Sequence, residues 1–381
     1  MHLPNDIEIL KGKVQKILNP VRPTEKKGTK TEESFVCSAK RTNAGRKLPP
    51  YYLIYFLFVD LLGYENLGRF EKIAWAVPID CNGTVYFLEH RKMGMGLFAT
   101  NRDYQEDECL EIVKKIKKAI KVAHPYFEWF ANNSAKRSKL NVLNYSERLY
   151  GRYEFLLTEH KKKIEEAISW KNETQHSDNL WNAYKLKRES EWLALSAIDA
   201  FYGFTEHIFI LASILRGQLL TGEDVANLAD KNWASKFKEC LDIEDNTVKL
   251  YYDKLITIKR QIRNYMAHGA FGKNGEAFQI HSGAGAVPLL MPHQKGSSRF
   301  SMRGGTEFRE EEAISAIEEF MRFYWDSSNF PEVLYIKSRL PCILTYASNS
   351  TYKNAITSID NMRRLVDHLT GIHDRAGDMD W

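Results

Sequence analysis

The chain has 381 residues, of which 44% are hydrophobic and 12% aromatic, so it can bury a sizeable core and is not a largely disordered chain. Its formal net charge of +5 is compatible with a nucleic-acid partner without requiring one. The 5 cysteines form no Cys-x-x-Cys pair, which argues against a zinc site and a disulfide framework. Neither a signal pattern nor a run of eighteen apolar residues is present, so we expect a cytoplasmic protein that does not span a membrane.

The N-terminal part, residues 1–135, is predicted to be a small α/β domain that senses a signal or selects a substrate. Two segments with strand-like alternation flank Asn82-Gly83, a strong hairpin-turn signal. The predicted elements are a short helix or strand at 11–18, a buried aromatic segment at 51–62, strands at 71–79, 84–91 and 96–100, and a lysine-rich amphipathic helix at 107–124 that Pro125 should end.

A candidate metal site lies on the predicted hairpin. Pro78-Ile-Asp80, followed by Glu89-His-Arg91-Lys92, loosely resembles the Pro-Asp…Glu-x-Lys pattern of restriction-endonuclease-like nucleases. That resemblance implies two carboxylates on Mg²⁺ and a lysine that polarises the attacking water. Ile79 separates the proline from the aspartate and arginine replaces lysine unless Lys92 serves, so a hairpin with polar edges is the preferred interpretation.

Residues 140–328 are predicted to form a helical domain. The segment 179–219 begins charged and becomes apolar on most sides, which requires a central place in a bundle or at an oligomer interface. Within it, His207 is interpreted as a core histidine with satisfied hydrogen bonds. Thr221-Gly-Glu-Asp224 is a helix-capping signal. The expected helices are 145–170, 179–219, 224–229, 233–241, one ending at His268, and 310–325.

The stretch Lys259 to Gly269 ends the most regular amphipathic segment of the second half. Apolar residues recur upstream at spacings of three and four, which predicts one buried stripe. At 100° per residue, Arg260, Asn264 and His268 fall on the opposite side, with Arg263 at its edge. Arginine offers a fork of donors that suits phosphate, and histidine exchanges protons near neutral pH. Together these groups are the minimum for RNA cleavage without a metal.

Arg263-Asn264-x-x-x-His268 resembles the Arg-x4–6-His motif of the HEPN superfamily (higher eukaryotes and prokaryotes nucleotide-binding). The resemblance implies a helical bundle, and in active members a metal-independent endoribonuclease whose arginine and histidine meet their counterparts across a homodimer interface. It implies that His268 is the acid/base group, that Arg263 stabilises the phosphate and that Asn264 orients His268, with Lys259 and Arg260 holding flanking phosphates. Some HEPN toxins carry a regulatory tyrosine two residues past the histidine; Ala270 occupies that position here.

The remaining residues are predicted to complete the bundle. Short strands at 277–281 and 286–291 would form a basic β-flap near the proposed site, and 300–308 could add a strand. The tail, 329–381, is expected to be a strand-helix extension packed on the helical domain, with a strand at 342–346 and a helix at 352–369. Its histidines, His368 and His373, are five apart, so one helical face cannot present both to a metal.

The sequence therefore predicts an α+β protein that is mostly α. The favoured function is a HEPN-type endoribonuclease that needs no cofactor and cuts RNA by transesterification, serving as a toxin or anti-phage effector under a regulatory protein or nucleotide trigger. A non-catalytic HEPN module for dimerisation or nucleotide binding is one alternative. A metal-dependent nuclease built on Asp80 and Glu89 is the other.

Overall fold

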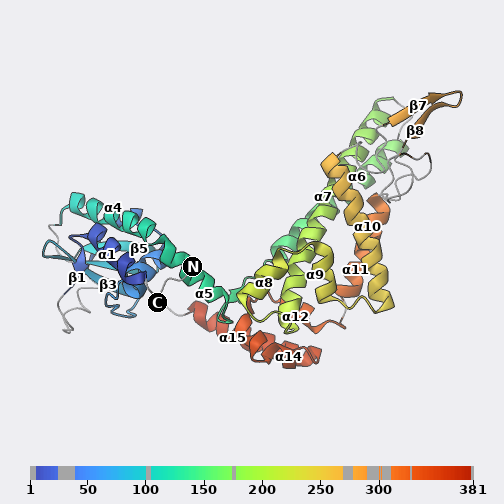
Figure 1. The fold of residues 1–381 in the computed structure, drawn as a ribbon. Helices are drawn as coiled ribbons and strands as arrows, with labels where there is room; N and C mark the ends of the chain where they lie inside the picture. Colours follow the sequence, from blue (N-terminus) through green and yellow to red (C-terminus); the bar gives the residue numbers. More distant parts are fainter. Residues whose placement is uncertain are drawn as a thin grey trace. The chain divides into compact units, whose positions relative to one another are not determined.

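The structure, a computed structural model, is mostly helical with a small antiparallel sheet, which confirms the predicted fold class at this level (Figure 1). The chain divides into two compact units: unit 1 is Met1–Ala135 with Ile372–Trp381, and unit 2 is Lys136–Gly371. The structure describes residues 6–24, 39–99, 104–173, 177–268, 278–289, 300, 302, 310–326 and 328–378, and of these the side chains of 171–173, 177–180, 261–268, 288 and 375–378 lie outside the description.

Unit 1 is built on an antiparallel sheet with the strand order β1-β3-β4-β5-β2. The predicted hairpin is confirmed, because Asp80 pairs with Val85 and Cys81 with Thr84. Asn82 and Gly83 have φ values of 51° and 85°, the positive values that a tight hairpin turn between right-twisted strands requires. The strands are β1 (Arg22–Pro23), β2 (Lys40–Arg41), β3 (Ile73–Cys81), β4 (Thr84–Arg91) and β5 (Gly94–Ala99).

Helices cover one face of this sheet and form the main core of unit 1. The alternation of β3 and β4 places Trp75, Val77, Tyr86 and Leu88 on this face. The predicted helix at 107–124 is confirmed and ends at Val122, before Pro125, as predicted. Pro125 stands at the second position of a new helix, where its missing N–H costs no bond. The elements are α1 (Ile7–Leu18), η1 (Ala44–Lys47), α3 (Tyr51–Tyr55), the π-helical segment η2 (Phe56–Leu61), α4 (Glu106–Val122) and α5 (His124–Ala135).

Unit 2 is a helical assembly around the hairpin of α6 and α7. Its elements are α6 (Ser146–Glu173), α7 (Ser177–Leu215), α8 (Gly222–Ala229), α9 (Trp233–Cys240), α10 (Asn246–His268), α11 (Glu310–Tyr324), α12 (Pro331–Lys337), α13 (Leu344–Ser348), α14 (Thr351–Ala355) and the part of α15 (Ile359–Asp378) up to Gly371. Two short sheets pair β6 (Asn141–Val142) with β9 (Cys342–Ile343), and β7 (Phe278–Ser282) with β8 (Gly285–Leu289). The second of these is the predicted β-flap; of its possible third strand, only Phe300 and Met302 are described.

The second half of α7 is the centre of unit 2, as its all-round apolar sequence predicts. Ile198, Phe201, Phe204, Ile208 and Phe209 are fully buried. Their neighbours come from α9, α10, α11 and the segment after it, so the one long apolar helix is covered on most sides. The helix that follows begins with the predicted capping box, in which Thr221 and Asp224 each bind the other's backbone N–H.

Two predictions for the tail are wrong. The strand predicted at 342–346 is only two residues long, because the chain turns into α13 at Leu344. The single helix predicted at 352–369 is two helices, α14 and α15. The hydroxyl of Ser358 accepts the N–H of Asn361 at 3.2 Å and so caps the start of the second one.

Candidate functional site

Helix α10 carries the motif that the sequence singles out. The carboxylate of Asp245 accepts the N–H groups of Thr247 (2.7 Å) and Val248 (3.1 Å), which fixes the start of the helix. Leu255 is fully buried and Ile258 nearly so. Tyr251 stacks on Phe323 of α11, with ring centroids 4.9 Å apart. One side of α10 is therefore committed to packing, as its apolar periodicity predicts.

The helical backbone continues through the whole motif and ends at His268. With about 3.6 residues per turn, Arg260, Asn264 and His268 follow one another along the side away from the buried stripe, and Arg263 lies beside them. The side chains of Arg263, Asn264 and His268 lie outside the described residues. The described backbone thus gives the motif a regular helical scaffold, while the positions of its functional groups stay a prediction.

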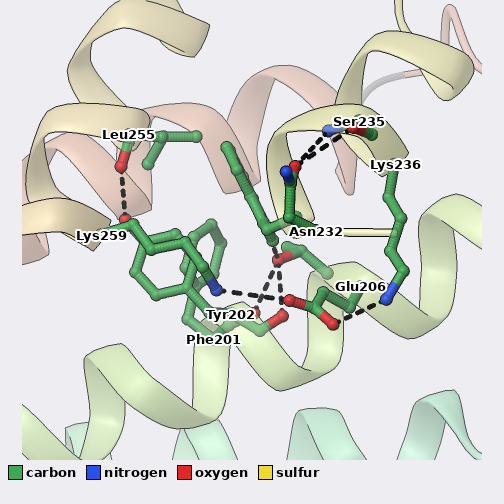
Figure 2. A network of polar contacts seen from close by, with 10 residues as sticks. Phe201, Tyr202, Glu206, Asn232, Ser235, Lys236, Leu255 and Lys259 are labelled. Atoms are coloured by element: carbon green, nitrogen blue, oxygen red, sulfur yellow. Dashed lines mark hydrogen bonds and ion pairs between the residues drawn. The ribbon is translucent and has the colours of Figure 1, made fainter. Parts of the chain in front are cut away.

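Lys259, predicted to hold a phosphate, belongs to an internal ion network (Figure 2). Its ammonium lies 3.3 Å from Oε1 of Glu206 on α7, and Lys236 of α9 lies 2.9 Å from Oε2 of the same carboxylate. The side chain of Lys236 is only 6% exposed. One carboxylate therefore ties together three helices, and the charge of Lys259 is already met inside the protein. Arg260, the next residue, is exposed.

Aromatic side chains complete the network around Glu206. The hydroxyl of Tyr202 donates a hydrogen bond of 2.7 Å to the carbonyl oxygen of Leu255, which joins α7 directly to α10. The ammonium of Lys259 lies 4.6 Å from the centroid of the Tyr202 ring, within the range of a cation–π contact. Buried Trp233 donates through its indole N–H to the hydroxyl of Thr205 at 2.9 Å. The helix that carries the motif is thus held in register with α7.

Sequence reasoning gave Glu206 no role. The signal was available, because a carboxylate inside an otherwise apolar helical run needs a cationic partner when the helix is buried. What no local pattern supplies is the identity of the partners, Lys236 and Lys259, which are 30 and 53 residues away.

His207 is half-buried rather than a fully buried core residue, but it makes the hydrogen bond expected of a structural histidine. Its Nε2 accepts the backbone N–H of Tyr145 at 2.9 Å, so the ring is neutral with its proton on Nδ1. Burial lowers the pKa of His207 to about 4, because desolvation disfavours the charged form. It is therefore unsuited to proton transfer near neutral pH.

The candidate metal site in unit 1 is not assembled. Asp80 and Glu89 point to the same face of the sheet, but they are four residues apart in the strand register, about 13 Å. Oδ1 of Asp80 accepts the N–H of Gly83 at 3.2 Å, a turn contact. Glu89 is fully buried beside Arg91, with Nε and Oε2 2.5 Å apart. Two carboxylates so placed cannot share one Mg²⁺.

Among the described residues, no group of three or more His, Cys, Asp or Glu side chains could hold a metal ion, and His368 and His373 of the tail belong to none. In the same part of the chain, one helix, Trp181–Leu215 of α7, has the length and composition to cross a membrane. Since 72% of its most apolar window is buried inside the protein, this is weak evidence and also fits a core helix.

Comparisons of the chain with protein-family models, with curated proteins and with solved structures gave no match.

Proposed function

We propose that this protein is a metal-independent endoribonuclease of HEPN type, with its active site at the end of α10. The observation that carries the proposal is the α10 helix itself. It is packed through one side and tied to α7 through Tyr202 and Lys259, and it continues unbroken through Arg263 to His268. A rise of about 1.5 Å per residue separates these two residues by roughly 7.5 Å along the axis, a span on the scale of one nucleotide.

The proposed RNA cleavage requires two proton-transfer groups and one cation. The 2′-oxygen of the RNA attacks the adjacent phosphorus while the bond from phosphorus to the 5′-oxygen breaks. One His268 imidazole takes the 2′-proton, and a second, protonated imidazole gives a proton to the leaving 5′-oxygen. Arg263 stabilises the charge on the phosphoryl oxygens, and Asn264 orients the imidazole one turn away. A homodimer supplies both imidazoles, and the products end in a 2′,3′-cyclic phosphate and a 5′-hydroxyl.

An enzyme of this kind destroys RNA whenever it is active, so it suits a toxin or anti-phage effector held inactive until a regulatory protein or nucleotide releases it. Unit 1, with its separate core, is the part of the chain available for that sensing role.

The test is cleavage of a 5′-labelled single-stranded RNA in the presence of EDTA. We expect His268→Ala and Arg263→Ala each to lower the rate at least a hundredfold, since each removes a group that acts in the transition state. His368→Ala is the matched control, because His368 is an exposed histidine on a helix of the same unit. End-group analysis should find the cyclic phosphate.

The alternatives give different results in the same assay. Cutting that needs Mg²⁺ and is lost in Asp80→Ala would replace this proposal with a metal nuclease. Binding of RNA or nucleotide without cleavage, in the presence of a trigger that alters unit 1, would favour a non-catalytic module.

A further inference from the structure

The first half of α7 carries an exposed stripe of aromatic and basic side chains, defined here as Trp181, Tyr184, Lys185, Arg188 and Trp192. At 100° per residue, the spacings of three, four and seven place all five on one side of the helix. The three aromatic residues are 70%, 56% and 56% exposed. Large aromatic side chains left in water over three helical turns are unusual in a protein with an ample core.

Four of the five members of this stripe contact one another in sequence. Trp181 and Tyr184 are stacked, with ring centroids 6.0 Å apart and an angle of 27° between the planes. The guanidinium of Arg188 lies 6.0 Å from the Tyr184 ring and 5.4 Å from the Trp192 ring. The side chains thus form a continuous ladder in which a cation separates flat rings, rather than four isolated exposed groups.

As far as the described residues go, the stripe faces away from the side on which this part of α7 packs in unit 2. Buried residues of this part of α7, such as Ser190 and Ala194, lie on the opposite side of the helix. Glu189 turns toward α6, where it pairs with Lys163 at 3.0 Å, and Glu191 lies at the edge of the stripe. The exposed surface therefore combines aromatic rings with two basic residues.

The aromatic and basic composition of the stripe indicates which class of ligand it would bind. Single-stranded nucleic acid offers flat bases that stack on aromatic rings and on guanidinium planes, and phosphates that pair with lysine and arginine. A second copy of the chain fits less well. A two-fold contact centred on the stripe would place Lys185 and Arg188 against the same two basic residues of the other copy, and like charges repel.

The stripe lies on the same side of α7 as the contact with α10. Arg188 is eighteen residues, about five full turns, before Glu206, so both lie on the side of α7 that meets Lys259. Helix α10 meets α7 at this point, where Tyr202 contacts Leu255 and Glu206 contacts Lys259. From the Glu206–Lys259 contact, His268 is about 13 Å along α10 and Trp192 about 21 Å along α7. The motif and the near end of the stripe are therefore each within about 21 Å of this contact, on helices that meet there.

We infer that the stripe from Trp181 to Trp192 is a binding surface for single-stranded RNA, on which successive bases stack. In its choice of RNA as the ligand, this inference rests on the proposed function. What the inference adds is a binding surface for the part of the RNA outside the reacting phosphate. On this surface Arg188 and the two tryptophans are binding residues.

The experiment measures binding of the full chain to a fluorescein-labelled, 2′-O-methylated single-stranded RNA of about 20 nucleotides by fluorescence anisotropy. This RNA cannot be cleaved through its 2′-oxygen, so binding is read apart from cleavage. We expect Trp181→Ala and Trp192→Ala each to weaken binding roughly tenfold. Trp192→Phe should retain most of the affinity, because phenylalanine also stacks. Arg188→Ala should lower the slope of log affinity against log salt by about 1.

The matched control is Phe155→Ala, since Phe155 is 62% exposed on neighbouring α6 and is outside the stripe. Circular dichroism and size-exclusion chromatography check that each variant keeps its fold and oligomeric state. Unchanged affinity in a variant that combines Trp181→Ala with Trp192→Ala would overturn the inference, as would a loss of affinity that occurs only because the variant no longer dimerises.

Cleavage of unmodified RNA separates the two proposals. If the wild type binds through the stripe but cuts nothing with any trigger, the proposed function fails and the binding surface stands. If the wild type cuts RNA and the stripe variants bind and cut normally, the inference fails alone.

Discussion

Glu89 in unit 1 and Glu206 in unit 2 are both carboxylates placed among apolar neighbours, but they differ in burial and in the number of cations that they contact. Glu89 is fully buried and meets one cation, Arg91, through Oε2, while its Oε1 has no hydrogen-bond partner in the described part of the chain. Burial raises its pKa to about 7 in spite of the arginine. Glu206 is 34% exposed and gives one oxygen to each of two lysines. Pairing with two lysines makes Glu206 a structural anchor, whereas burial makes Glu89 a group that titrates near neutral pH.

The most direct way to test this difference is Glu89→Gln. The folded-state pKa of about 7 lies above the ordinary value of 4.5, so the folded state holds this proton more tightly than the unfolded state. The stability that it contributes is full below about pH 4.5 and is lost as the pH rises to about 7. The Glu89→Gln variant cannot ionise. Relative to the wild type it should gain stability over this pH range, by at most about 3 kcal/mol.

Buried cysteines allow each unit to be followed separately. Cys81 and Cys109 report on unit 1, and Cys240 and Cys342 on unit 2. Urea unfolding at several pH values, with labelling by a dipyridyl disulfide and mass spectrometry, gives the stability around each pair. Glu71→Gln is the control, because the side chain of Glu71 is 78% exposed. A Glu89→Gln variant that is equally destabilised at pH 5 and pH 8 would contradict the assignment.

His207 extends the comparison to a base, for which stability should change with pH in the opposite direction. Its folded-state pKa of about 4 lies below the ordinary value of 6.5, so the unfolded state binds the proton first as the pH falls. Unit 2 should lose stability between about pH 6.5 and pH 4, whereas the Glu89 contribution to unit 1 grows over much of this range. Because the ring is partly exposed, we expect a loss of about 2 kcal/mol.

The measurement is the same urea series read at Cys240 and Cys342. His207→Gln should remove this acid sensitivity, since its side chain can accept the Tyr145 N–H and carries no titrating group. His368→Gln, at an exposed site, should leave it in place. An acid loss of equal size in wild type and His207→Gln would assign the sensitivity to other groups.

The sequence predicts the parts of this molecule that short-range chemistry determines. Asn82-Gly83 requires positive φ values and has them, and Thr221 with Asp224 forms the expected capping box. The amphipathic period of α10 gives its buried side correctly. An apolar run such as 342–346 fails as a predictor, since it suits a strand or a helix equally well and the packing around it decides.

The candidate site also has features that the sequence predicts and features that it does not. The helical spacing of Arg260 and the motif residues follows from sequence alone, whereas the engagement of Lys259 does not. Glu206 is far from Lys259 in the chain, so the pair exists only after α7 and α10 pack. The exposed ladder on α7 does not follow from the sequence either, because the exposure of Trp181 and Trp192 depends on how the surrounding helices pack.

Lys259→Met tests the smallest effect and the one closest to the proposed chemistry. If Lys259 is a structural partner of Glu206, its loss leaves Lys236 to neutralise the carboxylate, and the stability cost should be below about 1 kcal/mol. The salt dependence of RNA binding should not change, because no phosphate contact is removed. Arg260→Ala, one residue on, should instead lower the salt slope by about 1 without altering stability. Lys254→Met is the control, an exposed α10 lysine paired with Glu319 at 3.1 Å. A Lys259→Met variant with a reduced salt slope would mean that the ammonium leaves Glu206 for the RNA backbone, and the phosphate role predicted from the sequence would then be restored.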